Sequence, residues 1–283
     1  MNNATPRSRK IPGRPIMISL AIVGTFFVIF LIIRNSGNTN SDSSSSSTQK
    51  SDLSTIEPPQ KTDLPEISDV ANIEEKTAKI VYLTFDDGPG PYTAELLNIL
   101  KKYNIKATFF VTGAGDDALI AREFNEGHTV GLHSYTHDYA YIYSGIGNFF
   151  EDLYSIQDRV KNITGETSTI IRFPGGSSNL VSTKYDGGAH IMSTLAYEVA
   201  ARGFTYFDWN VSSGDAGAPL PSDQIYENVV NNLKPEFSVV LQHDIKDYSV
   251  NAVERIINYG LKNGYTFKRL EKDSFSAHHG INN

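Results

Sequence analysis

The sequence predicts an α/β protein whose parallel sheet closes, or nearly closes, into a barrel. From about residue 79, apolar β-like runs alternate with amphipathic helix-like stretches about seven times. Strand followed by helix, repeated along a chain, is typical of a parallel sheet with helices outside it. No unit repeats at a period of roughly 20–50 residues, which argues against a solenoid. An open doubly wound sheet fits the same alternation.

The predicted strands are short runs rich in apolar, β-branched and aromatic residues. They cover Ile80–Phe85, Ala107–Val111, Thr129–Leu132, Thr169–Phe173, Phe204–Val211, Phe237–Leu241 and Tyr265–Leu270. The stretches between them are amphipathic, as expected of helices that cover a sheet. They include Thr93–Tyr103, Asn148–Ile163, Ile191–Arg202 and Val250–Asn263.

The positions of reactive side chains favour the barrel over the open sheet. Most of them stand at the C-terminal end of a predicted strand. They are Asp86 and Asp87 after the first strand, His133 after the third, Arg172 after the fourth, Asp208 in the fifth and His243 after the sixth. In an α/β barrel these ends converge on one face, where active sites are built. In an open sheet, strands so far apart in order would not all meet at one crevice.

The N-terminal residues predict a membrane anchor followed by a tether. Residues 16–33 form an uncharged apolar run of 18, just long enough to span a bilayer as a helix. Four basic residues lie in the preceding segment 1–15, which places that tail in the cytoplasm and the rest of the chain outside. A cleaved signal peptide is the alternative. Residues 34–78 are Ser-rich and poor in apolar residues, so we expect a disordered linker before a catalytic domain at 79–283.

The composition excludes several kinds of reactive site and argues against one class of partner. The chain has no cysteine, which excludes disulfides, thiolate metal sites and cysteine nucleophiles. It carries 25 basic and 32 acidic side chains, and eight of each precede residue 79, so the net charge of −7 lies in the remainder. An acidic catalytic region argues against nucleic acid as a partner. Nothing in the sequence indicates a protein partner.

Two aspartates and two histidines form a candidate ligand set. Asp86 and Asp87 end an apolar strand, and a turn at Gly88 would let both reach one pocket. One would bind a metal ion and the other would take a proton from water. His133 and His137 have the spacing that puts both rings on one face of a helical turn, although each motif alone also fits a surface turn or surface histidines. Two imidazoles and a carboxylate suit a divalent transition metal with open positions.

The remaining motifs supply candidate orienting, acidic and substrate-binding groups. Arg172 ends a strand and can orient a catalytic carboxylate, and an exposed glycine amide just after it can donate to a developing oxyanion. Asp208 beside His243 would raise the imidazole pKa and make it a general acid. Trp209 and Leu241 would line an apolar patch for an acetyl methyl or a sugar face, with core packing as the alternative.

Five motifs in this order resemble the NodB-like polysaccharide deacetylases, carbohydrate esterase family 4. They are TFDDGP (84–89), HSYTH (133–137), RFPGG (172–176), FDWN (207–210) and LQH (241–243), and the similarity covers about residues 79–271. The resemblance implies a distorted (β/α) barrel of about seven parallel strands. It also implies metal-assisted removal of N- or O-acetyl groups from a carbohydrate polymer.

The resemblance also implies a role for each matching residue. Asp86 corresponds to the general base, oriented by Arg172, and Asp208 would tune the general acid His243. The metal ligands would be Asp87, His133 and His137. The Gly175 amide stands where the family supplies an oxyanion donor, although many members carry a bulkier residue there. The ligand set suits Zn²⁺, and Co²⁺ would also fit.

We therefore expect a membrane-anchored extracytoplasmic hydrolase that acts on an acetylated glycan polymer. Anchoring and a tether favour a local polymer, so N-acetylglucosamine of peptidoglycan is the first choice of substrate. The alternatives are deacetylation of xylan, chitin or another exopolysaccharide, and a glycan-binding protein without catalytic activity.

Overall fold

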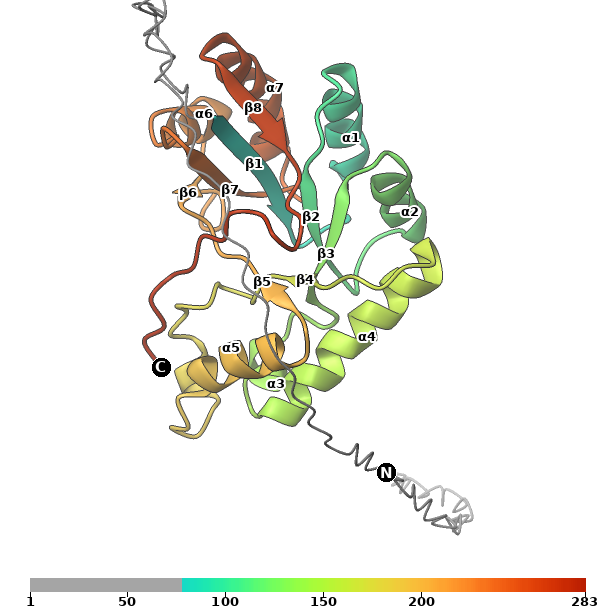
Figure 1. The fold of residues 1–283 in the computed structure, drawn as a ribbon, viewed down its shortest axis with the longest axis vertical. Helices are drawn as coiled ribbons and strands as arrows, with labels where there is room; N and C mark the ends of the chain where they lie inside the picture. The colour runs from blue at the N-terminus through green and yellow to red at the C-terminus, as the bar shows by residue number, and fades with distance from the viewer. Residues whose placement is uncertain (1–77) are drawn as a thin grey trace, which may run out of the picture. The chain divides into compact units, whose positions relative to one another are not determined.

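The computed structural model describes residues 78–283, in which strands and helices alternate along the chain (Figure 1). The strands are β1 (Lys79–Asp86), β2 (Thr108–Thr112), β3 (Thr129–Ser134), β4 (Ile170–Ile171), β5 (Thr205–Tyr206), β6 (Val211–Ser212), β7 (Phe237–His243) and β8 (Tyr265–Lys268). The helices are α1 (Thr93–Lys102), α2 (Asp117–Asn125), α3 (Tyr139–Ile142), α4 (Ile146–Thr164), α5 (Ile191–Ala201), α6 (Ser222–Val230) and α7 (Asp247–Lys262), with a 3₁₀ turn at Ser182–Lys184.

All strand pairs among the described residues are parallel, as predicted. The order across the sheet is β5-β4-β3-β2-β1-β7-β6, and β8 is an additional neighbour of β1. β7 pairs with β1 along one side, and two strands share the other side of β1. Residues 84–86 pair with β2, whereas residues 79–82 pair with β8. β1 is therefore the central strand, and Asp86 at its end lies in register with His243 of β7.

One continuous segment closes the barrel. The chain predicted as a single strand, 204–211, forms two short strands that belong to opposite edges of the sheet. β5 lies along β4, and Phe207 N still donates to Ile171 O (3.0 Å). Asn210 N then donates to Val239 O (3.1 Å), which begins the pairing of β6 with β7. The chain itself thus bridges the two edges, and the parallel sheet forms a half-barrel that fits the predicted distorted barrel better than an open doubly wound sheet.

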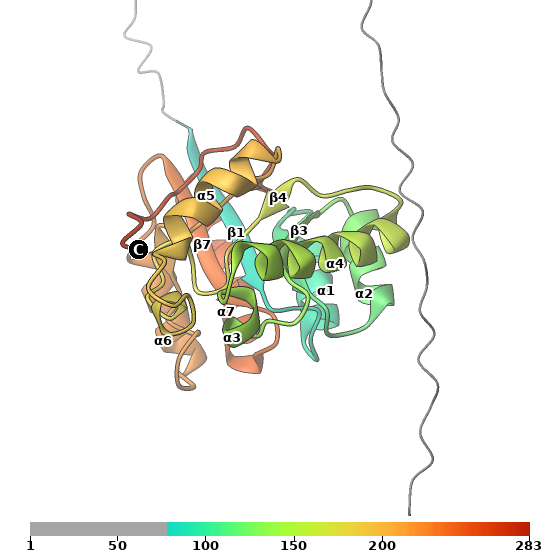
Figure 2. The same ribbon diagram turned by 90° about the horizontal axis from the view of Figure 1, so that it is seen from below.

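The sheet separates two apolar layers. In β1, Val81, Leu83 and Phe85 belong to the outer core, against which the helices pack. Ile80 and Tyr82 point the other way, into the barrel, because side chains alternate along a strand. Figures 1 and 2 show the helices α1, α2, α4 and α7 outside the sheet. The barrel interior is therefore apolar at the start of the strands and free to hold polar groups at their ends.

Helix α4 illustrates how sequence pattern places the helices. Its buried apolar side chains recur at helical spacing, as in an amphipathic helix that covers a sheet. They are Phe149, Phe150, Leu153, Ile156 and Val160.

Three helices, α2, α3 and α6, were not predicted from the sequence. For α2 the local signal is Asp116, whose side chain caps the helix by accepting a hydrogen bond from Ala118 N (2.9 Å).

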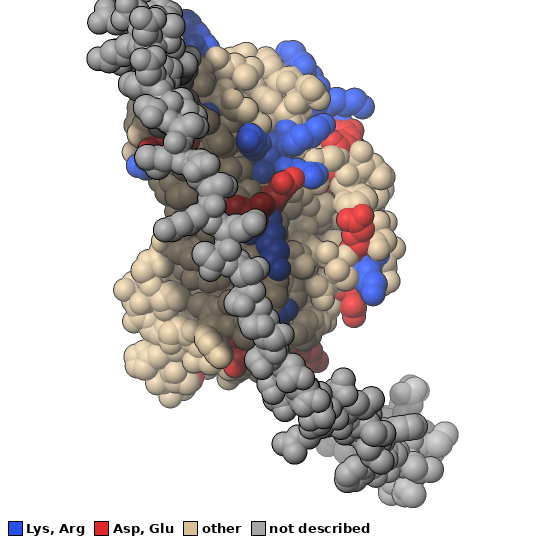
Figure 3. Space-filling model, viewed as in Figure 1, with Lys and Arg blue, Asp and Glu red and all other residues tan. Residues whose placement is uncertain are grey.

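Charged groups of both signs lie side by side on the face shown in Figure 3. Ion pairs among the described residues include Arg122–Glu126 (2.8 Å) and Arg269–Glu271 (3.1 Å). Within residues 78–283, no helix has the length and apolar character needed to cross a membrane. The predicted tail (1–15), anchor (16–33) and linker up to residue 77 lie outside the described residues.

The packing of the barrel interior can be tested at Gly131 of β3. A Cβ there would lie 2.7 Å from Phe110 Cδ1, so Gly131→Ala must displace this buried ring. We expect a loss of about 1–3 kcal/mol in the free energy of unfolding, the usual cost of overpacking. The measurement is urea denaturation of the full chain in detergent.

Gly147→Ala in α4 is the matched control, because nothing lies within 4 Å of its added methyl group. Gly147 is exposed in the first turn of α4, so that variant should change the free energy of unfolding by no more than about 0.5 kcal/mol. A Gly131→Ala variant as stable as the wild type would contradict the described contact between β3 and Phe110.

Candidate metal centre and active site

The turn after β1 presents two carboxylates to the same region. Asp86 is the last residue of the strand, and Asp87 has φ = +71°, a conformation that bends the chain sharply. The next residue, Gly88, lies where a side chain would clash with a neighbouring residue. A Cβ at this position would lie 2.3 Å from Oδ2 of the buried Asp244. The prediction that a turn toward Gly88 brings both aspartates to one site is confirmed.

Asp87, His133 and His137 form a cluster. Asp87 Oδ1 lies 3.4 Å from His133 Nε2 and 3.2 Å from His137 Nε2, and all three potential ligand atoms lie within 4.8 Å of one another. Asp87 Oδ1 is buried and has no hydrogen-bond partner among the described residues. A buried carboxylate oxygen that faces two imidazole nitrogens is costly to leave unsatisfied, so the donor set fits a divalent metal ion.

The charges around Asp87 favour its ionised form. Burial by itself would raise the pKa of this carboxyl group. The interaction with His133 and the charges of His137 and His243 outweigh burial, so the pKa of Asp87 falls below its ordinary value. A carboxylate that is already deprotonated is the form that binds a metal.

The two histidines do not share a helical turn, contrary to the expectation from their spacing. His133 lies in β3, whereas His137 lies in the following loop with φ = +52°. The loop doubles back, which brings the two rings to a centroid separation of 5.3 Å. His133 Nδ1 hydrogen-bonds the carbonyl of Arg172 (2.8 Å), which places the proton on Nδ1 and leaves Nε2 free for a metal.

Asp152 of α4 holds this loop and was not predicted. Its carboxylate accepts four hydrogen bonds, from Ser134 Oγ (2.6 Å), Tyr135 N (2.7 Å), Thr136 N (2.8 Å) and Thr136 Oγ1 (2.7 Å). Ser134 Oγ in turn accepts from His137 N (2.9 Å), so this hydroxyl also fixes the backbone of the loop. Asp152 sits in the middle of an amphipathic helix, where sequence alone suggests a solvated position.

Arg172 orients Asp86 inside the barrel. Its guanidinium is fully buried and donates to Asp86 Oδ1 (2.8 Å) and Thr84 Oγ1 (2.7 Å) through Nη1. Asp86 Oδ2 remains on the side of the metal cluster, 4.0 Å from His133 Nε2. The predicted contact between Arg172 and Asp86 is therefore present, and it leaves one carboxylate oxygen available for proton transfer.

His243 pairs with Asp215, so the prediction that Asp208 tunes His243 is wrong. Asp215 lies in the loop after β6. Its Oδ1 bonds His243 Nδ1 (2.8 Å), and its Oδ2 accepts from His243 N (2.8 Å). Burial tends to lower the pKa of His243, but the hydrogen bond and charge of Asp215 raise it overall. His243 Nε2 faces the cluster, 3.7 Å from Asp87 Oδ2.

Asp208 instead secures the loop after β4. Its carboxylate accepts hydrogen bonds from Ser177 N (2.8 Å), Ser177 Oγ (2.5 Å) and His279 N (2.9 Å), and its side chain is fully buried. His279 thus ties the C-terminal segment to this part of the barrel.

The predicted substrate-binding residues have different environments. Trp209 is partly buried, with its ring 5.7 Å from the Arg172 guanidinium and close to Gly176. Leu241 is 4% exposed and points to the same side of β7 as His243, since the two are two residues apart. Gly175 has φ = +78°, and its amide donates no hydrogen bond to a described residue. These positions neither establish nor contradict substrate contacts, so their roles stay predictions.

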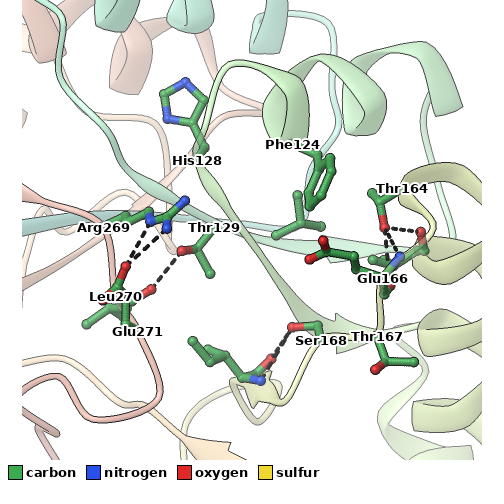
Figure 4. Close-up of a pocket in the computed structure, with 13 residues that line it drawn as sticks. Phe124, His128, Thr129, Thr164, Glu166, Thr167, Ser168, Arg269, Leu270 and Glu271 are labelled. Atoms are coloured by element: carbon green, nitrogen blue, oxygen red, sulfur yellow. Dashed lines mark hydrogen bonds and ion pairs between the residues drawn. The ribbon is translucent and has the colours of Figure 1, made fainter.

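The cavity shown in Figure 4 lies at the other end of the strands. It has a volume of about 220 Å³ and is lined by the first residues of β3 and β4, including Thr129 and Ile170. Arg269 and Glu271 form an ion pair at its rim. In α/β barrels this end serves stability, whereas chemistry takes place at the C-terminal ends. The cavity is therefore separate from the candidate metal centre.

Comparison with known proteins identifies the family. The polysaccharide deacetylase family model matches residues 73–187. A peptidoglycan N-acetylglucosamine deacetylase of Bacillus cereus is 38% identical over 207 residues, which cover 70% of this chain and 72% of that protein. A peptidoglycan N-acetylmuramic acid deacetylase of Bacillus subtilis is 29% identical over 210 residues, which cover 71% of this chain and 73% of that protein.

A solved structure agrees with the sequence relatives. The catalytic domain of a peptidoglycan N-acetylglucosamine deacetylase from Eubacterium rectale superposes with a TM-score of 0.71 at 53% identity, covering 72% of this chain and 94% of that one. Fold, motif order and relatives therefore agree: the chain belongs to the polysaccharide deacetylases of carbohydrate esterase family 4, which are hydrolytic enzymes.

Proposed function

We propose that this protein is a metal-dependent deacetylase that removes N-acetyl groups from N-acetylglucosamine in peptidoglycan. The observation that carries the proposal is the arrangement around Asp87. Its Oδ1 faces His133 and His137, and its Oδ2 faces His243. A metal site, a carboxylate base and an imidazole acid thus lie within reach of a single acetamide group, as amide hydrolysis requires.

Asp87, His133 and His137 would hold the metal. A bound Zn²⁺ would act as a Lewis acid on the acetyl carbonyl and favour deprotonation of the attacking water. Asp86 Oδ2 accepts the proton of that water while the water oxygen bonds to the carbonyl carbon. The Gly175 amide donates to the oxygen on which negative charge develops. Arg172 holds Asp86 in place throughout.

In the second half of the reaction, His243 acts as the general acid. As the bond between carbonyl carbon and nitrogen breaks, His243 Nε2 delivers a proton to the leaving nitrogen. One water and one acetamide therefore yield one free amine and one acetate. Asp215 supports this step because it holds the proton on Nδ1 and stabilises the charged imidazole.

The relatives support the choice of polymer. The Bacillus cereus and Eubacterium rectale proteins are named for N-acetylglucosamine of peptidoglycan and show the higher identities, 38% and 53%. The Bacillus subtilis protein, named for N-acetylmuramic acid, is 29% identical. N-acetylglucosamine is therefore the first substrate to test, with N-acetylmuramic acid second.

The proposal includes location at the outer face of a cell membrane. It rests on the apolar run 16–33 and the basic residues before it, which lie outside the described residues. A helix retained there would keep the enzyme within reach of the wall polymer.

Metal removal tests the first part of the mechanism. Chelation of the full chain should abolish acetate release from N-acetylglucosamine oligomers, and added Zn²⁺ should restore it. Asp87→Ala removes the only carboxylate of the proposed ligand set, so that variant should stay inactive after zinc is added. The measurements are enzymatic acetate assay and metal analysis of the purified protein. Full activity in a metal-free sample would refute the mechanism.

The pH profile tests the pairing of His243 with Asp215. The acid must be protonated, so activity falls as pH rises through the pKa of His243, which Asp215 raises. Asp215→Asn removes the charge that raises this pKa. The alkaline limb of the kcat profile should therefore move to lower pH, and kcat at neutral pH should fall roughly tenfold or more.

Asp208→Asn is the matched control, since Asp208 contacts Ser177 and His279 rather than His243. It should lower stability without moving the alkaline limb. A shift of the limb in Asp208→Asn but not in Asp215→Asn would overturn the assignment.

A further inference from the structure

We propose that the hydroxyl group of Tyr139 is a second hydrogen-bond donor to the acetyl oxygen of the substrate, next to the amide of Gly175. This inference rests on the proposed deacetylation and adds a residue that the sequence motifs do not indicate. Tyr139 is the first residue of the short helix α3, two residues after His137.

Tyr139 lies between the metal cluster and the loop after β4. Its ring meets the ring of His137 edge-on, with centroids 5.3 Å apart and an interplanar angle of 88°. On the other side, its hydroxyl oxygen lies 3.2 Å from the point where a Cβ of Gly175 would be. A backbone nitrogen is about 2.5 Å from its own Cβ, so the hydroxyl lies at most roughly 6 Å from the Gly175 amide nitrogen.

Two donors without partners therefore stand side by side. The Tyr139 hydroxyl forms no hydrogen bond with any residue of the described range 78–283. The Gly175 amide likewise donates to none of these residues. Both groups are thus free to donate to one external oxygen beside the metal cluster.

The glycine at position 175 explains why a tyrosine from another loop occupies this space. Gly175 has φ = +78°, which a residue with a side chain adopts only with strain. A Cβ would also come within 3.2 Å of both the Tyr139 hydroxyl and Asn179 Cβ. A bulkier residue at position 175 would compete with Tyr139 for this volume. In this chain Tyr139 fills it and brings a hydroxyl group.

The neighbouring Tyr143 is a tyrosine with a structural role, and its environment differs from that of Tyr139. Its ring is fully buried and its hydroxyl donates to Pro174 O (2.7 Å), which fixes the loop that carries Gly175. Tyr139 is only half-buried and has no such partner. Its hydroxyl therefore contributes to the site through a ligand rather than through the fold.

The test is Tyr139→Phe in the full chain, which keeps the ring against His137 and removes only the hydroxyl. With N-acetylglucosamine oligomers and the zinc-loaded protein, kcat should fall roughly tenfold or more while KM changes little, because the lost bond strengthens as the oxyanion develops. Metal content and melting temperature should match the wild type. An unchanged kcat would overturn the proposal.

Two control variants separate a substrate role from a structural one. Tyr197→Phe deletes a hydroxyl from a side chain that is 72% exposed on α5 and should change nothing. Tyr143→Phe deletes the hydroxyl that fixes the loop and should lower the melting temperature. A drop in melting temperature for Tyr139→Phe equal to that of Tyr143→Phe would assign Tyr139 to the fold instead.

Acetate binding provides a readout that does not depend on turnover. Calorimetry on the zinc-loaded wild type and Tyr139→Phe should show weaker acetate binding in the variant, since acetate carries the oxygen that the hydroxyl would contact. If the wild type releases no acetate from any glycan, the proposed function fails, and this comparison still decides the role of Tyr139. Equal acetate affinities would then refute it.

Discussion

The candidate active site depends on one buried charge, the guanidinium of Arg172. It is fully buried and donates to two side chains of β1 and to the carbonyls of Phe207 and Asp208 in the segment that bridges the sheet edges. The carbonyl of the same residue accepts from His133. A buried charge persists only when it is fully paired, and loss of one partner costs about 3–5 kcal/mol. The pairing therefore fixes the base, a metal ligand and barrel closure together.

Around this centre, buried carboxylates hold the loops that carry the reactive groups. Asp152 binds the loop with His137, Asp208 binds the loop after Gly175, and Asp215 binds His243 itself. Each carboxylate accepts at least one backbone N–H, a charge-assisted bond stronger than a neutral one. The strands set the approximate positions of the reactive side chains. These carboxylates then determine their orientation, which catalysis requires to be accurate within a fraction of an ångström.

The sequence predicted what depends on local pattern and missed what depends on contacts between distant segments. Apolar runs located the strands, and motifs at their ends pointed to Asp87, His133 and Arg172, which the fold brings close together. Asp215 escaped notice because its partner His243 is 28 residues away and only the fold joins them. The wrong choice of Asp208 has the same cause, since nearness to a strand end does not tell which carboxylate reaches an imidazole. Tyr139 was missed because it approaches Gly175 only in the folded protein.

The central claim is that this site hydrolyses the acetamide of peptidoglycan N-acetylglucosamine. The most direct measurement treats purified peptidoglycan with the zinc-loaded full chain and quantifies both released acetate and newly formed glucosamine. We expect equal molar amounts of the two, with muramic acid left acetylated. Acetate release without new free amine would instead indicate an O-deacetylase, and free amine on muramic acid alone would assign the other sugar; either result would refute N-deacetylation of N-acetylglucosamine.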